Sequence, residues 1–192
     1  MHSYSIDSEI RRTVHVILGV IAFALPAWIK EAQTIMGLPV TLGYPLSFGV
    51  TFGILHFVFN KWLWKFLSKL SLLPDLNGNW VVEGDSSFED GTPFAGNVTI
   101  KQTFSSIEIF GEFRESTSRS TLAGFCLNHA MPIFRYAFEN TPKNLSNAEL
   151  QRHPGLIELR IASADELKGD YFSGKHRLRF GEMVLKRARK SA

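Results

Sequence analysis

Two apolar stretches without a charged residue lie in the first third of the chain and limit how it can fold. They span residues 13–29 and 42–59, and each approaches the length of a helix that crosses a bilayer. Backbone groups inside a bilayer must satisfy their hydrogen bonds internally, so two such stretches with a short polar connection are typical of a helical hairpin. We therefore expect residues 1–74 to form a two-helix transmembrane module, with helices at about 13–29 and 42–66.

Basic residues predict the orientation of this module. They flank its outer ends, whereas the connecting loop carries only Lys30, offset by Glu31. The flanking cations are Arg11, Arg12, Lys61, Lys65 and Lys69. Lys and Arg mark the cytoplasmic ends of membrane helices, so we expect a multi-pass protein with both termini in the cytoplasm. A cleaved signal peptide is the alternative, but the second apolar stretch follows closely and no small-residue cleavage site separates the two.

The second apolar stretch contains a GxxxG pattern formed by Gly49 and Gly53. Small residues at this spacing let membrane helices approach closely, so we expect these glycines to form a helix-packing face. The alternative is that glycine is simply frequent in membrane helices. The basic and aromatic residues that follow, at 61–69, predict an anchor at the lipid interface rather than a nucleic-acid site.

The chain changes character between Leu73 and Trp80. Pro74 ends the helical part, Asn77 and Gly78 favour a turn, and residues 75–192 then read as strands. We expect an eight-stranded antiparallel up-and-down, lipocalin-like β-barrel, with a flattened sandwich as the alternative. The predicted strands are 78–85, 94–104, 107–114, 119–128, 132–140, 155–163, 166–172 and 177–187.

Alternation along these strands predicts which residues face inward. The predicted inward residues are Trp80, Val82, Val98, Ile100, Ile107, Ile109, Phe113, Phe134, Tyr136, Phe138, Ile157, Leu159, Ile161, Leu178 and Phe180. Gly181 is expected to break the last strand with a bulge. Tight turns around Ser105, His129 and Ala164 belong to one end of the barrel, so the longer loops gather at the other end.

That loop-rich end is the predicted binding site, because barrel mouths are concave and their loops supply polar groups. Arginine suits phosphate oxygens and tyrosine offers a flat surface for a base, so the spacing favours an anionic ligand. Solvation of each cation is the competing interpretation. The candidate ligand-binding residues are Arg114, Arg119, Thr121, Tyr136, Tyr171, Lys175 and Arg177.

Composition and motifs exclude several other functions. Residues 75–192 carry equal numbers of basic and acidic residues, so the pI near 9.1 is no sign of binding to DNA or RNA. The single Cys126, expected to be a buried strand residue, excludes an intramolecular disulfide and a cysteine-based zinc site. No hydrolase, phosphate-loop or metal-ligand motif is present, so we expect neither an enzyme nor a bound metal or cofactor.

The order of these modules resembles a known family. Two membrane helices lead through Leu73-Pro-Asp-Leu-Asn-Gly-Asn-Trp80 into one β-rich domain, over essentially the whole chain. This is similar to the two-transmembrane, β-barrel effectors of bacterial CBASS anti-phage systems, which are associated with CD-NTase nucleotidyltransferases. The Gly-x-Trp of the junction also occurs in lipocalins, so the order of the modules is the stronger resemblance.

The resemblance implies a receptor anchored in the bacterial inner membrane. Residues 75–192 would bind a cyclic dinucleotide made by a partner CD-NTase during phage infection. Binding would drive homo-oligomerisation, and the helices would then disrupt the membrane and kill the cell. Two alternatives stay open: a membrane-anchored lipocalin-like carrier of a lipid or small molecule, and a structural membrane protein whose barrel only docks a partner.

Overall fold

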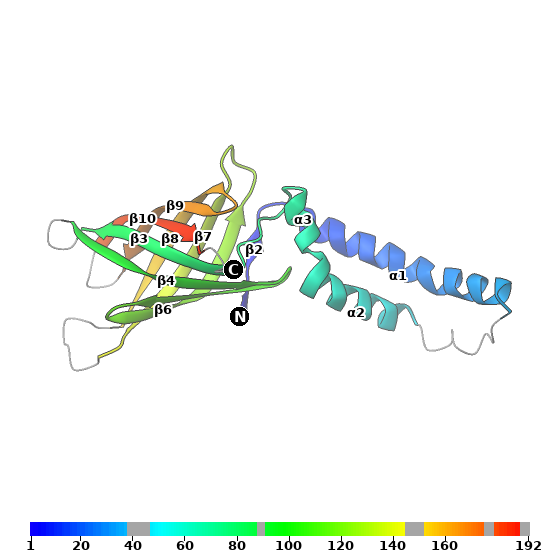
Figure 1. Ribbon diagram of the computed structural model, residues 1–192. Helices are drawn as coiled ribbons and strands as arrows, with labels where there is room; N and C mark the ends of the chain where they lie inside the picture. The colour runs from blue at the N-terminus through cyan, green and yellow to red at the C-terminus, as the bar shows by residue number, and fades with distance from the viewer. Residues whose placement is uncertain (38–46, 88–90, 145–151, 175–178, 189–192) are drawn as a thin grey trace. The chain divides into compact units, whose positions relative to one another are not determined.

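The computed structural model describes residues 1–37, 47–87, 91–144, 152–174 and 179–188 (Figure 1). The chain divides into two compact units, and each is described here by itself. One unit contains Glu9–Leu72, and the other contains Met1–Ser8 together with Leu73–Ala192. The first eight residues therefore belong with the β-rich unit, and the helical unit is connected to it at both ends.

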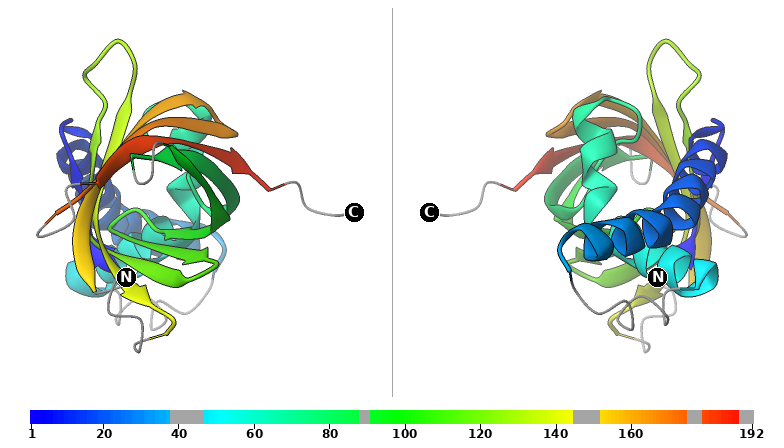
Figure 2. Two further views of the ribbon diagram at one scale, coloured as in Figure 1. Left: turned by 90° about the vertical axis from the view of Figure 1, so that its left-hand side faces the viewer. Right: turned by 90° about the vertical axis from the view of Figure 1, so that its right-hand side faces the viewer.

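The β-rich unit is a closed barrel (Figure 2). Consecutive strands from β3 to β10 pair antiparallel, and β10 pairs back with β3. The predicted antiparallel up-and-down barrel and its eight strands are confirmed. The strands are β3 (Gly78–Ser86), β4 (Thr92–Gln102), β5 (Ser106–Phe113), β6 (Ser116–Cys126), β7 (Ile133–Pro142), β8 (His153–Ser163), β9 (Glu166–Ser173) and β10 (Arg179–Arg187).

The junction predicted from Pro74 and Trp80 closes the tight-turn end of this barrel. Trp80 is fully buried, and its ring nitrogen donates a hydrogen bond to Leu76 O at 3.0 Å. The Arg187 guanidinium lies 4.3 Å from the centre of the Trp80 ring and donates to Asp75 O at 3.0 Å. Trp80 is thus held by apolar packing, a hydrogen bond and a cation–π contact.

Two short N-terminal strands complete the barrel at the β5–β6 seam, where the direct pairing of neighbouring strands is shortest. β5 and β6 pair directly only at residues 110–112 and 117–119. Beyond those pairs, β1 (His2–Ser3) adds antiparallel to β5 and β2 (Ser5–Ile6) adds parallel to β6. The N-terminal strands thus supply backbone partners to strand edges that would otherwise be open at the tight-turn end.

Tyr4 fixes this N-terminal segment in the barrel. Its ring is buried and meets Phe125 edge to face, with 5.5 Å between ring centres. Its hydroxyl donates hydrogen bonds to Thr103 O at 3.1 Å and Phe104 O at 2.9 Å. A single side chain therefore joins the segment to both sides of the seam.

Replacing Tyr4 with alanine is expected to lower the free energy of unfolding of the barrel by about 3 kcal/mol, because a large buried ring is removed. Tyr4→Phe is the matched control, since it keeps the ring and loses about 1 kcal/mol with the hydroxyl. Denaturant unfolding of the full chain measures both values. Faster amide hydrogen exchange in β5 and β6 of Tyr4→Ala locates the effect, and equal stability of the two variants would contradict it.

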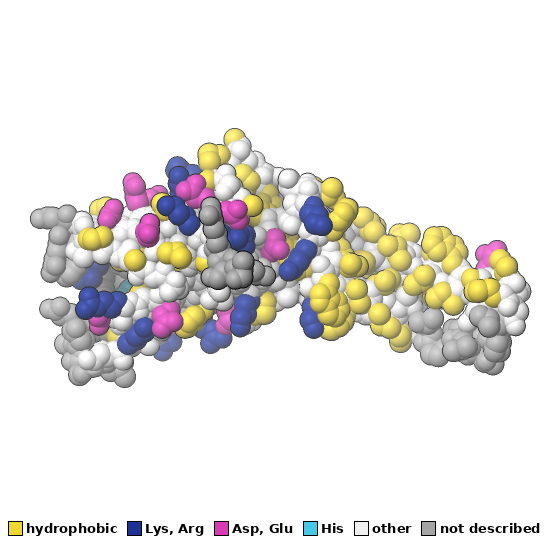
Figure 3. Space-filling view, in the orientation of Figure 1, with side chains coloured by type: hydrophobic (Ala, Val, Ile, Leu, Met, Phe, Trp, Pro, Cys, Tyr) yellow, Lys and Arg dark blue, Asp and Glu magenta, His cyan; other side chains and the backbone are white. Residues whose placement is uncertain are grey.

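The helical unit contains α1 (Ile10–Ile35), α2 (Phe48–Val58), a π-helical turn η2 (Phe59–Leu63) and α3 (Lys65–Lys69). Among the described residues, α1 is the one helix long and apolar enough to cross a membrane. α1 packs against α2, and the rings of His15 and His56 stack 5.4 Å apart. Apolar side chains cover the outside of both helices (Figure 3). Of the predicted second helix, residues 42–46 lie outside the described residues.

The predicted inward face of the last strand and the bulge predicted at Gly181 were both wrong. Phe180 faces outward with 59% of its surface exposed, and Gly181 continues the ladder without a bulge. The register shifts instead between Ser120 and Leu122 in β6 and between Ile161 and Ser163 in β8. Because β10 runs without interruption, Arg179 shares the inward face with the buried Met183 and Leu185. Leu178 lies outside the described residues.

Candidate functional site

The two halves of the barrel differ in what faces inward. Toward the tight-turn end, the inward side chains are large, apolar and fully buried, as Trp80, Phe134 and Leu159 illustrate. The mouth is the opposite end, where β3 ends and β4 begins. There the inward positions combine aromatic rings, glycines and polar groups, and several of the rings are only half-buried. The inward side chains near the mouth are therefore more exposed to solvent than those at the tight-turn end.

Four inward-facing aromatic side chains line this half of the barrel, and we refer to them as the aromatic collar. They are Phe94, Phe113, Phe138 and Tyr171. Phe94 lies 5.5 Å from Tyr171 and 6.1 Å from Phe113, centre to centre, and both pairs have edge-to-face geometry. Such rings present flat apolar faces on which a nucleobase can stack.

The collar rings lie over inward-facing glycines of the wall. A Cβ atom on Gly84 would lie 2.7 Å from the ring of Phe94, and one on Gly181 would lie 2.8 Å from the ring of Tyr171. Phe138 covers Gly155 in the same way. Because these glycines carry no side chain, the rings can lie close against the wall. Glycine at these positions is required by packing.

Polar side chains form a second layer at the mouth. Register pairs Ser118 with Asn140 and Asn140 with His153, and all three lie on the inward face. Directly opposed residues of antiparallel strands share a face, so these side chains form a row across β6, β7 and β8. The Asn140 Oδ1 atom is buried and, among the described residues, accepts no hydrogen bond. A buried acceptor without a donor costs about 1–3 kcal/mol, which a ligand N–H group would recover.

Arg179 contributes a cation to the same half of the barrel. It is the first residue of β10, faces inward and is partly buried. The buried Ser173 hydroxyl fixes its backbone, accepting from Arg179 N at 3.3 Å and donating to Arg179 O at 3.2 Å. The hydroxyl thereby fixes the position from which the guanidinium extends. A guanidinium is suited to binding a phosphate group with two parallel hydrogen bonds.

The residues predicted for the site do not all face the interior of the barrel. Tyr136 and Tyr171 face inward, and register places both opposite Ile157. Burial raises the pKa of Tyr136 above its usual value. Thr121 lies exposed at the β6 bulge, where its hydroxyl donates to Ala137 O at 3.4 Å.

The predicted cations are placed differently from Arg179. Arg114 is exposed in the β5–β6 turn, 3.3 Å from the carboxylate of Glu115. Arg119 lies on the outer face and donates to Glu108 at 2.9 Å, which lowers the pKa of that carboxyl group. Lys175 and Arg177 lie outside the described residues. The role of these four cations in binding stays a prediction.

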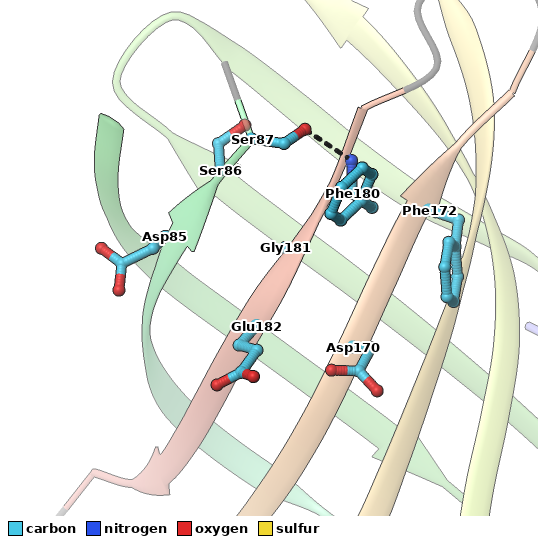
Figure 4. A pocket seen from close by; sticks show the side chains of 8 residues that line it. All are labelled: Asp85, Ser86, Ser87, Asp170, Phe172, Phe180, Gly181 and Glu182. Atoms are coloured by element: carbon cyan, nitrogen blue, oxygen red, sulfur yellow. Dashed lines mark hydrogen bonds between the residues drawn. The ribbon is translucent and has the colours of Figure 1, made fainter. Parts of the chain in front are cut away.

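Two hollows on the outer face of the barrel are less suited to an anion. One of about 350 Å³ is lined by Phe172, Phe180 and the carboxylates of Asp85, Asp170 and Glu182 (Figure 4). The other, of about 460 Å³, contains Arg119, already paired with Glu108. Acidic groups repel a phosphate in the first hollow and compete for the cation in the second. The mouth is therefore the better candidate for an anionic ligand.

A closed barrel with an aromatic and polar mouth, in a chain that also contains an apolar helix of membrane-spanning length, fits a small-molecule-binding domain with a membrane anchor. The family described as Cap15, cyclic dinucleotide receptor domain, matches residues 71–187. The chain belongs to this family, as its resemblance to CBASS effectors predicted.

Two curated relatives carry the name CD-NTase-associated protein 15. The protein of Yersinia aleksiciae is 28% identical over 191 residues, covering 94% of this chain and 91% of the relative. That of Escherichia albertii is 28% identical over 127 residues, covering 63% of this chain and 59% of the relative. The first match extends through the helical unit as well as the barrel.

Sequence reasoning did not identify Arg179, Asn140 or Ser173 as site residues. Arg179 was missed because a bulge was expected at Gly181, which changes the side that each residue before it faces. Strand alternation counted back from the buried Met183, without a bulge, places Arg179 on the inward face. Asn140 and Ser173 carry no such signal, because a single polar residue at the end of a strand is usually solvated.

Proposed function

We propose that the barrel mouth binds a cyclic dinucleotide. The observation that carries this proposal is the buried Asn140 Oδ1 atom, which accepts no hydrogen bond from the described residues and lies on the inward face that also holds the aromatic collar. A cyclic dinucleotide has two bases and two phosphates. The bases would stack on the collar, an exocyclic amino group would donate to Asn140, and Arg179 would bind a phosphate.

The ligand would come from a CD-NTase acting in the same cell during phage infection. The names of both relatives point to this association. The enzyme makes the ligand and the barrel receives it, so the two proteins need no direct contact. Family membership at the level of the receptor domain supports the ligand class.

We further infer that the chain crosses the inner membrane an even number of times and keeps its barrel in the cytoplasm. β1 and β2 are hydrogen-bonded to β5 and β6, so the N-terminus and the barrel lie on the same side of any membrane. α1 supplies one crossing, and an even number needs a second one before Leu73. Residues 42–66 are the apolar candidate, and the cations at both ends of the module favour the cytoplasmic side.

Ligand binding would act by promoting assembly of several copies, whose membrane helices then disrupt the lipid bilayer. A ligand shifts an assembly equilibrium only when it binds the assembled state more tightly. Gly49 and Gly53 are exposed within the helical unit, and a Cβ atom on either would meet no atom of the described residues within 4 Å. This face is thus available for a helix of another copy.

Calorimetric titration of the full chain in detergent tests the ligand assignment. Cyclic dinucleotides of varied base and linkage are compared with the matching linear dinucleotides and with a fatty acid. We expect saturable binding of at least one cyclic dinucleotide and weaker binding of its linear form, because the ring restricts the ligand before it binds. Binding of the fatty acid alone would favour the lipocalin-like carrier, and binding of none would overturn the proposal.

A further inference from the structure

Three side chains with metal-binding groups meet at the tight-turn end of the barrel, away from the mouth. Asp7 follows β2, Cys126 ends β6, and His129 lies in the connection to β7. A carboxylate oxygen of Asp7, the Cys126 sulfur and a ring nitrogen of His129 all lie within 4.8 Å of one another. Carboxylate, thiolate and imidazole are the ligand types that bind Zn²⁺ in proteins.

The backbone fixes Asp7 in position for such a site. Leu127 N donates to Asp7 Oδ1 at 2.6 Å, and Asn128 N donates to Oδ2 at 3.4 Å. Asp7 N in turn donates to Phe125 O at 3.1 Å. The carboxylate is therefore held against the residues that follow Cys126, and each oxygen keeps acceptor capacity for a metal ion.

The surroundings of Cys126 also suit a metal-bound sulfur. Cys126 is half-buried rather than fully buried as expected, so an ion can reach it from solution. A guanidinium nitrogen of Arg135 lies 3.9 Å from its sulfur, and Arg135 is itself paired with Glu158 at 2.6 Å. A hydrogen-bond donor beside the sulfur can orient it as a metal ligand.

We propose that Asp7, Cys126 and His129 bind one Zn²⁺ ion. Three protein ligands leave a fourth position for water, which completes a tetrahedral geometry. The ion would join the N-terminal segment to the β6–β7 connection by bonds stronger than the short β2 pairing alone. Since the segment leads directly into α1, zinc would hold the residues just before α1 to the barrel.

Cobalt substitution in the full chain tests this site, with any affinity tag removed and the protein first freed of metal. One equivalent of Co²⁺ is expected to give intense visible d–d bands of tetrahedral cobalt together with a thiolate-to-cobalt charge-transfer band. Zn²⁺ should abolish both. Cys126→Ser should lose the charge-transfer band, and His129→Ala should lose tetrahedral binding.

Two further variants separate metal binding from folding. Asp7→Asn keeps an acceptor for the Leu127 N–H group but loses the charge and the acceptor facing Asn128 N, so it should bind Co²⁺ much more weakly while the unfolding temperature of the metal-free protein falls only slightly. His15→Ala, in α1, is the control for a histidine elsewhere and should keep the full spectrum. Weak octahedral bands in the unaltered chain, or a charge-transfer band that survives Cys126→Ser, would overturn the proposal.

Discussion

Replacing Arg179 with alanine is expected to weaken binding of a cyclic dinucleotide about 30-fold or more. Loss of one charged partner from a partly buried phosphate contact costs about 2 kcal/mol at the low end of such effects, and each 1.4 kcal/mol is tenfold in affinity. Arg179→Glu should abolish detectable binding, because the inward position would then carry a charge of the same sign as the phosphate. Calorimetric titration of the full chain measures both.

The choice of controls decides whether the inward position matters or only the net charge. Arg160→Ala removes an exposed, outward-facing cation of β8 and should leave the affinity within about twofold. Alanine at Arg114, Arg119 and Arg177, tested singly, examines the cations predicted from the sequence. If the affinity is unchanged in all three, these residues do not belong to the site. If the affinity is unchanged in Arg179→Ala, Arg179 does not bind the ligand.

Leucine at Gly49 or Gly53 is expected to abolish killing of infected cells while leaving nucleotide affinity unchanged. Among the described residues, neither glycine has a neighbour within 4 Å of an added Cβ atom, so a longer side chain starts in open space within one chain. A bulky side chain on this face would instead prevent close approach of another helix. We expect ligand-driven assembly in detergent to weaken at least tenfold, or about 1.4 kcal/mol.

Survival of infected cells and sedimentation of the detergent-solubilised protein give the two measurements. Ile54→Leu is the control, because Ile54 is also exposed on α2 and the change conserves volume. It should kill and assemble normally. If killing persists in both glycine variants, this face is not the assembly surface, whatever the ligand affinity.

The barrel could be predicted because its signals are local. Alternating apolar residues, as at Ile107 and Ile109, and turn residues, as at Asn77 and Gly78, each report on a few neighbouring positions. The register of individual strands could not be predicted equally well. One bulge between Ser120 and Leu122 changes which residues of β6 face inward, and nothing in the local sequence requires it.

The N-terminal strands and the clusters they form depend on distant residues. β1 and β2 have two residues each, which is too short for alternation to be visible. His2 pairs with Ile107, and Asp7 meets Cys126, across most of the chain. Spacing along the sequence therefore gave no indication of either the closed seam or the metal-ligand cluster.

The completed seam makes the helical unit an insertion into the receptor domain rather than an extension before it. A soluble receptor is therefore best made by replacing Glu9–Leu72 with a short flexible linker, since truncation before residue 75 removes two strands. The order of synthesis has a related consequence. Met1–Ser8 leaves the ribosome long before β5 and β6, so the receptor closes only after the apolar helices have emerged.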